Sequence, residues 1–200
     1  MHAVKAYFSR HKTTKDITML SFFVITIVLL TLFINSYIFR VYSVVGASME
    51  PTMHTSDRLF VNKLPVTFAK LTGHNYLPKR DQIIVFKNPI EYIMPGEEFI
   101  VKRVIGLPGE RVVVSDGSIT VFNDEHPDGF NPDNNIQGPQ SPTSGNVDIT
   151  VPGDELFVSG DNRIGNHSLD SRSGLSTIPL SLIEGRVNLR VFPFNKLQVF

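Results

Sequence analysis

The chain has 200 residues and contains no cysteine and no tryptophan, and its 19 lysines and arginines balance its 19 aspartates and glutamates. Without cysteine the protein forms no disulfide, no thiolate nucleophile and no cysteine-ligated metal site. A formal net charge of zero argues against a nucleic-acid partner, because neutralising phosphates requires clustered cations. After residue 16 the sequence shows no run of like charges. We therefore expect no nucleic acid among its partners.

Charge is also missing from residues 17–39, an apolar segment that would form a helix roughly 35 Å long. That length is enough to cross a hydrocarbon core of about 30 Å. The nearby cations lie mainly in residues 1–16, and only Arg40 closely follows the segment. The positive-inside rule then predicts a cytoplasmic tail (1–16), a single-pass transmembrane helix (17–39) and an extracytoplasmic domain (40–200) in the cell membrane. The lipid bilayer is accordingly an expected partner.

A cleaved signal peptide is the alternative interpretation of this segment. The apolar region of a signal peptide is usually about 7–15 residues long and ends in a small-x-small cleavage site. Here the apolar run is longer, and phenylalanine, asparagine, tyrosine and arginine follow it. The pattern therefore favours an uncleaved anchor.

Beyond the segment, valine and isoleucine are frequent, and short alternating stretches end at glycine or proline. The expected strands are 39–45, 58–63, 81–87, 98–105, 110–115, 118–122, 147–151, 155–159 and 186–192. Asp116-Gly117 marks a hairpin. Residues 123–146, rich in Pro, Gly, Asn and Asp, predict a long, mobile surface loop, and residues 179–184 a short helical turn. The pattern predicts a mainly β protein, with an antiparallel domain that is barrel-like or a sandwich.

Ser48 lies in a turn of small residues, Gly46-Ala47-Ser48-Met49-Glu50-Pro51-Thr52, after the first expected strand. A serine hydroxyl becomes a nucleophile when a base lies within hydrogen-bond reach, although most serines in such turns are structural. Nine extended residues span at most roughly 30 Å, so Ser48 would work near the membrane surface.

Histidine is one class of candidate base. The histidines beyond the apolar segment are His54, His74, His126 and His167. All lie in polar stretches, where a solvated surface residue is the default expectation. A Ser-His-Asp triad that uses His167 and Asp170 stays open.

Lys102 is the stronger candidate, because it lies inside the apolar strand 98–105. Strand alternation places it on the face of Ile100 and Val104, and places Arg103 on the opposite face. To act as a base near neutral pH its pKa must fall by roughly 2–3 units, which burial can supply. If the strand lies at a sheet edge, Lys102 instead reaches solvent.

Residues 160–174 form a third notable stretch, dense in polar groups. By default such a stretch is a solvated turn. We predict two ion pairs in it, Asp161 with Arg163 and Asp170 with Arg172. Its serines could orient a neutral amine by hydrogen bonds; they are Ser168 and Ser171. The stretch shows no metal-ligand spacing, so no metal site is expected.

Taken together, these stretches resemble type I signal peptidase, the membrane-anchored bacterial leader peptidase with a serine–lysine dyad. The resemblance runs from the apolar segment to about Val187, and only residues 123–146 are unmatched. The matching motifs are residues 48–52, 57–63, 102–109, 160–163 and 168–172.

The resemblance implies a β-rich catalytic domain that needs no cofactor. It implies that Ser48 attacks the scissile carbonyl of an exported preprotein and that a neutral Lys102 takes the proton. It also implies that Ser168 orients the amine of Lys102. The residues that would brace the loop are Asp161, Asp170 and Arg172.

The substrates implied are preproteins with small residues one and three positions before the cut. They would lie extended between the strand before Ser48 and the strand that carries Lys102. The backbone N–H of Ser48 would stabilise the oxyanion. The wall candidates for the substrate pockets are Val44, Met49, Ile100 and Val101.

The chain departs from the family pattern in three places. Gly46 stands where some members carry a serine whose hydroxyl completes the oxyanion hole. The second hydrogen-bond donor of the oxyanion hole is therefore unidentified in this chain. Ser56 replaces a usual glycine. Residues 164–167 make the spacing to Ser168 two residues longer than usual, which leaves Ser171 as its substitute. The general signal peptidase has two alternatives: a specialised relative with one dedicated secreted, conjugation or pilus substrate, and an inactive membrane-tethered binding module.

Overall fold

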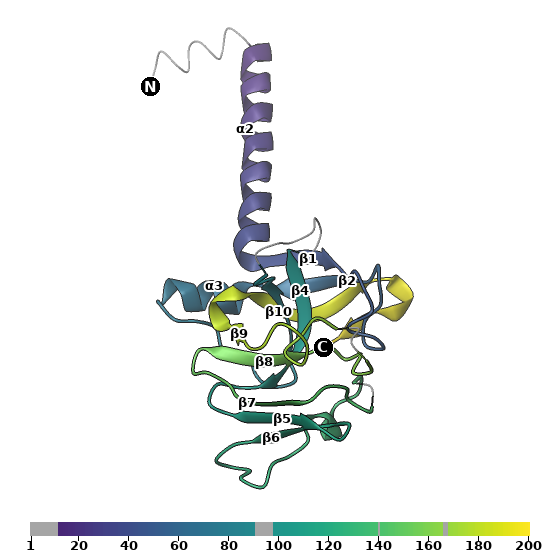
Figure 1. The fold of residues 1–200 in the computed structure, drawn as a ribbon. Coiled ribbons are helices and arrows are strands. Elements are labelled where there is room, and N and C mark those ends of the chain that lie inside the picture. Colours follow the sequence, from purple (N-terminus) through teal and green to yellow (C-terminus); the bar gives the residue numbers. More distant parts are fainter. Residues whose placement is uncertain (1–11, 91–97, 140, 166–167) are drawn as a thin grey trace. The chain divides into compact units, whose positions relative to one another are not determined.

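The computed structural model describes residues 12–90, 98–139, 141–165 and 168–200 (Figure 1). The chain divides into two compact units, Met1–Ile38 and Phe39–Phe200. Each unit is described by itself.

In the first unit an α-helix, α2 (Lys12–Phe33), continues as a π-helix, η1 (Ile34–Ile38). By length and composition alone, Thr13–Ile38 is long and apolar enough to cross a membrane. Its large apolar side chains are exposed. Three of its threonines donate their hydroxyl proton to the carbonyl four residues earlier, each at 2.8 Å; they are Thr18, Thr26 and Thr31. Hydroxyls satisfied within the helix remove a cost of placing it in hydrocarbon.

The second unit is built from two antiparallel sheets, which confirms the predicted mainly β fold class. The large sheet runs in the order β1-β2-β10-β3-β4-β8-β9, with β11 paired to β10, and the small sheet runs β6-β5-β7. Within the described residues no ladder joins the edge strands β1 and β9. The strands are β1 (Phe39–Ser43), β2 (Arg58–Asn62), β3 (Ile83–Lys87), β4 (Phe99–Gly106), β5 (Arg111–Ser115), β6 (Ser118–Phe122), β7 (Val147–Thr150), β8 (Glu155–Ser159), β9 (Ile178–Pro179), β10 (Ile183–Phe192) and β11 (Gln198–Val199).

The large sheet is buried on both faces, as β3 shows. Ile84 and Phe86 belong to one apolar cluster, and Ile83 and Val85 belong to another. Successive residues of a strand point to opposite faces, so each face of β3 has its own core. A third cluster lies in and beside the small sheet. Strand β4 is the neighbour of β3. The side chain of a cation on β4 therefore points into an apolar core, whichever face of the sheet it lies on.

The helical elements of this unit are short. They are α3 (Leu64–Leu71), η2 (Pro132–Asn135), η3 (Leu180–Leu182) and η4 (Phe194–Lys196). Helix α3 was not predicted from the sequence, whereas η3 falls within the predicted helical turn. The loop 123–146 is anchored at several points: Phe130 pairs with Val121 in a β-bridge, and Thr143 is buried. This loop consequently contributes contacts to the site.

Candidate active site

Ser48 lies in a turn between β1 and β2, and backbone hydrogen bonds join the two ends of this turn. The N–H of Val44 donates to the carbonyl of Asp57, and that of Ser56 to the carbonyl of Val44, each at 2.9 Å. Gly46 has a φ of 91°, a conformation that residues with a Cβ rarely adopt. A serine at position 46 would therefore be strained. The N–H of Ser48 donates no hydrogen bond to any described residue, so it is available to a ligand.

Lys102 meets Ser48 directly. Its Nζ lies 2.7 Å from Oγ of Ser48 and 2.9 Å from the carbonyl oxygen of Val101. The residue is only 3% exposed. Burial lowers the pKa of Lys102 from 10.5 to about 8, against the opposing charge of Asp170. A neutral Nζ at this distance can accept the hydroxyl proton.

The polar loop reaches the dyad because β8 is the sheet neighbour of β4. Arg103 pairs with Ser159, the last residue of β8, and Gly160 follows at once. A Cβ on Gly160 would collide with the carbonyl oxygen of Ser48 and with Oγ of Ser168. Glycine is required here for close approach of two backbone segments. Asn162 stabilises this contact between the two segments, because its backbone N–H donates to the carbonyl of Ser48 at 3.1 Å.

The two serines proposed as orienting groups lie in different surroundings. Ser168 is 1% exposed, and its Oγ has no hydrogen-bond partner of ordinary geometry among the described residues. It nevertheless lies near enough to Asp170 to help lower the pKa of that carboxyl group. The hydroxyl oxygen of Ser171 instead accepts the N–H of Val158 at 2.9 Å. Ser171 is thus committed to the backbone of β8.

Asp161 is fully buried and pairs with Arg103. Nε and Nη2 of Arg103 donate to its two carboxylate oxygens at 2.8 and 2.6 Å. The hydroxyl of Thr52, in the turn of Ser48, donates to the same carboxylate. The predicted pair between Asp161 and Arg163 is wrong, because β4 brings Arg103 beside Asp161. Arg163 pairs instead with Asp133 of the loop 123–146, at 2.7 Å.

The predicted pair between Asp170 and Arg172 is present, with an N–O distance of 2.8 Å. The carboxylate of Asp170 also accepts the N–H of Gly160 at 2.8 Å. Burial would raise the pKa of Asp170, but the hydrogen bonds and charge of Arg172 outweigh it, so the pKa is lowered. Asp170 is therefore ionised at neutral pH. Arg172 also donates to the carbonyl of Arg163 at 2.8 Å, which fixes the start of the loop.

A cleft of about 380 Å³ opens beside the dyad. Of the four wall candidates, Val44, Ile100 and Val101 line it. Met49 does not line it; it is 1% exposed and packs in the apolar cluster beneath the turn. Further wall residues, which the sequence did not single out, include Tyr42, Leu59, Val85, Phe99 and Leu169.

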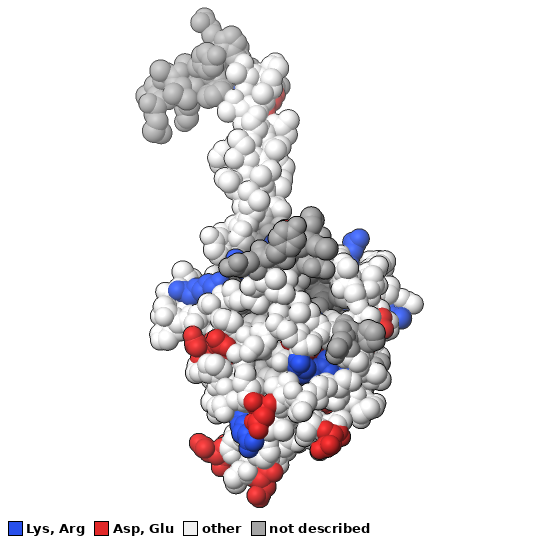
Figure 2. Space-filling model, viewed as in Figure 1, with Lys and Arg blue, Asp and Glu red and all other residues white. Residues whose placement is uncertain are grey.

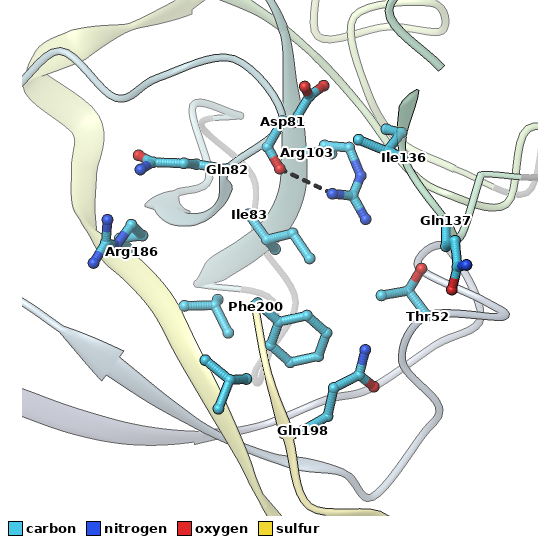
Figure 3. Close-up of a pocket in the computed structure, with 12 residues that line it drawn as sticks. Thr52, Asp81, Gln82, Ile83, Arg103, Ile136, Gln137, Arg186, Gln198 and Phe200 are labelled. Carbon is cyan, nitrogen blue, oxygen red and sulfur yellow. Dashed lines mark hydrogen bonds between the residues drawn. The ribbon is translucent and has the colours of Figure 1, made fainter. Parts of the chain in front are cut away.

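A second cavity, of about 350 Å³, lies elsewhere and includes neither member of the dyad (Figure 3). Arg103 borders it and donates from Nη1 to the backbone oxygen of Asp81 at 2.8 Å, the bond drawn in Figure 3. The ring of Phe200 lies in the middle of this view. Arg103 therefore joins this cavity to the carboxylate of Asp161.

Among the described residues, Oγ of Ser48 forms a hydrogen bond with Lys102 and with no histidine. His54, His74 and His126 are exposed. His167 lies outside the described residues, so the alternative triad stays a hypothesis. Sequence reasoning missed the roles of Arg103, Thr52 and Gly160. Their presence inside the matching motifs was the only available signal.

Three comparisons relate the chain to known proteins. The family model described as signal peptidase, peptidase S26, matches residues 17–192. A signal peptidase I P of Bacillus subtilis subsp. natto is 36% identical over 182 residues, which cover 85% of this chain and 86% of that protein. A signal peptidase I of Bacillus amyloliquefaciens is 32% identical over 194 residues, 94% of this chain and 96% of that protein. A crystal structure of a signal peptidase I from Enterococcus faecalis V583 has 28% sequence identity and a TM-score of 0.35. The match covers 55% of this chain and 95% of that chain. The chain therefore belongs to the signal peptidase family, peptidase S26, and is a serine peptidase.

Proposed function

We propose that the protein is a membrane-bound endopeptidase that removes N-terminal signal peptides from exported preproteins, with Ser48 as nucleophile and Lys102 as general base. The observation that supports this most directly is the 2.7 Å contact between Oγ of Ser48 and Nζ of Lys102. The lysine is buried, and burial lowers its pKa to about 8. At pH 7 about a tenth of such lysines are neutral and able to accept a proton.

In the acylation step, Oγ of Ser48 attacks the scissile carbonyl carbon while its proton moves to Nζ of Lys102. The tetrahedral oxyanion accepts the free N–H of Ser48, a contact typically worth about 3–4 kcal/mol. When the intermediate collapses, the Lys102 ammonium gives its proton to the departing amine. The mature protein leaves, and the signal peptide remains as an ester on Ser48.

In the deacylation step, water attacks the ester carbonyl and Lys102 takes one of its protons. Collapse of the second intermediate returns a proton to Oγ of Ser48 and releases the signal peptide. Every step requires Nζ of Lys102 to point toward Oγ of Ser48. We assign this orienting role to Ser168, because its buried hydroxyl lies beside Gly160, where the loop meets the carbonyl oxygen of Ser48, whereas the hydroxyl oxygen of Ser171 accepts the N–H of Val158.

The cleft would receive an extended substrate whose small residues precede the cut. Its apolar wall includes Val44, Ile100 and Val101, which suits short aliphatic side chains. We place the N-terminus in the cytoplasm and the unit Phe39–Phe200 outside, on the distribution of cations around the apolar segment. The preprotein's own apolar segment, held in the same bilayer, would then present its cleavage site to the cleft.

The test is cleavage of a preprotein by the full chain in detergent, with the new N-terminus sequenced. Ser48→Ala and Lys102→Ala should each abolish cleavage, while circular dichroism shows an intact fold. Lys87→Ala is the matched control, because Lys87 is an exposed lysine on the adjacent strand β3. Robust cleavage by either dyad variant would refute the mechanism.

The alternative, a specialised relative with one dedicated substrate, would share this active site. A panel of general preproteins separates the two functions. Cleavage of several unrelated members supports the general enzyme. Cleavage of none, by a protein whose Ser48 is still acylated by an active-site reagent, supports the specialist.

A further inference from the structure

Helix α3 carries an apolar stripe on its outer face. Leu64, Phe68 and Leu71 are 50%, 70% and 80% exposed. They are spaced at i, i+4 and i+7, so they share one side of the helix. Val66, on the other side, is 5% exposed and packs in a core cluster. The helix is thus docked by one face and presents leucine and phenylalanine on the other.

The charged residues of the segment that carries this stripe all have one sign. Residues 63–80 contain four cations and no aspartate or glutamate, in a chain whose formal net charge is zero. Lys63 pairs with Glu184, and Arg80 pairs with Glu110. Lys70 and Lys79 are exposed and form no ion pair with any described residue. In Figure 2 the surface over α3 shows blue and white atoms, one red group lies just below it, and the other red atoms gather mainly toward the small sheet.

Chain connectivity places α3 close to the point where the catalytic unit begins. Phe39, its first residue, pairs with Asn62 across β1 and β2. Leu64 follows Asn62 by two residues, so its Cα lies within roughly 13 Å of that of Phe39. The apolar helical segment ends at Ile38. If that segment spans the bilayer, α3 must begin within or just beyond the headgroup layer.

We propose that α3 lies in the membrane interface, with Leu64, Phe68 and Leu71 among the acyl chains and Lys70 and Lys79 on anionic headgroups. An exposed apolar stripe beside free cations is the composition of interfacial helices. The inference rests on the proposed membrane-spanning segment, and it adds a second attachment. With one attachment the catalytic unit could tilt, whereas two attachments restrict the angle of the cleft to the bilayer.

The absence of tryptophan from the chain makes a direct test possible. Full-length Phe68→Trp is reconstituted in vesicles of phosphatidylcholine with about a third phosphatidylglycerol, and its fluorescence is measured with and without brominated acyl chains. We expect blue-shifted emission and at least twofold quenching by the brominated lipid. Phe122→Trp, in β6 of the small sheet, is the matched control and should be unquenched. Equal, negligible quenching of both probes would overturn the proposal.

Charge is tested in the same probe protein. Lys70→Gln together with Lys79→Gln, or vesicles without phosphatidylglycerol, should reduce quenching of the Trp at position 68 by half or more. Unchanged quenching would overturn the headgroup role of the lysines. Quenching that appears only when a protein partner is added would overturn the lipid as occupant.

The consequence for catalysis has its own measurement. Phe68→Ser together with Leu71→Gln should slow cleavage of a bilayer-embedded preprotein at least fivefold and leave cleavage of a short soluble peptide unchanged. Equal loss on both substrates would overturn the orienting role. Quenching does not depend on activity, so failure of this proposal and failure of the dyad mechanism are distinguishable.

Discussion

Replacing Lys102 by methionine should stabilise the fold while abolishing cleavage. Burial lowers the pKa of Lys102 from 10.5 to about 8, so the folded chain holds this proton less tightly than the unfolded chain. Between these two pKa values the unfolded state binds more protons, and stability rises with pH. The penalty is complete below pH 8 and vanishes above about pH 10.5. Methionine fills a similar volume without a charge to desolvate.

The penalty follows from the two pKa values. At pH 7 a fall from 10.5 to about 8 corresponds to about 3 kcal/mol, and at pH 9 to about 2 kcal/mol. Methionine forfeits the contact with Ser48, which offsets about 1 kcal/mol. Lys102→Met should therefore raise the free energy of unfolding by about 2 kcal/mol at pH 7 and by about 1 kcal/mol at pH 9.

The assay is urea unfolding of the full chain in one detergent, followed by circular dichroism at both pH values. Lys87→Met is the control, since Lys87 is exposed and its replacement should change stability by less than about 0.5 kcal/mol. The reasoning fails if Lys102→Met destabilises the protein at pH 7. It fails equally if the gain does not shrink between pH 7 and pH 9, because the shrinkage is the signature of the lowered pKa.

Four further outcomes are expected. Cleavage should rise about tenfold per pH unit and level off above about pH 8, as the base Lys102 loses its proton; a flat rate from pH 5 to 9 would exclude it. Gly160→Ala should lower kcat at least tenfold in a folded protein, because its Cβ displaces the nucleophile's carbonyl; an unchanged kcat would show that the loop has room. Asp161→Asn should lower the free energy of unfolding by about 3–5 kcal/mol, measured in urea, because it leaves Arg103 buried without its counter-charge. Ser56→Gly should raise the melting temperature and add about 1 kcal/mol, because residue 56 has a φ of 76°; a lower melting temperature would contradict this.

Local patterns predicted the strands well, because alternation is a property of neighbours in the sequence. Residues 118–122 and 155–159 are strands with the predicted bounds. Helix α3 was missed for a physical reason: its apolar stripe faces outward, and only Val66 is buried. The usual signal of a helix is a stripe that faces the core.

The site was predictable where its parts share a strand or a motif, and not where they meet across the sheet. The burial of Lys102 follows from its place between apolar residues of β4. The partner of Asp161 does not, because only the pairing of β4 with β8 brings Arg103 to it. The partner of Arg163 lies in the loop 123–146, which composition alone described as a surface excursion. Sheet order and loop packing are long-range facts that the composition of one segment does not contain.

The charges around the dyad explain how a lysine between two buried acids can lose its proton. Asp161 and Asp170 both raise the pKa of Lys102, which would keep it protonated and useless as a base. Each acid, however, is paired with an arginine of its own, Asp161 with Arg103 and Asp170 with Arg172. Guanidinium stays charged at every relevant pH, so each arginine offsets part of the charge of its carboxylate. Desolvation then remains the largest influence on Lys102, and it favours the neutral amine. The two pairs thus hold the loop against the nucleophile turn, and each arginine offsets the charge of an acid that would otherwise favour the protonated form of Lys102.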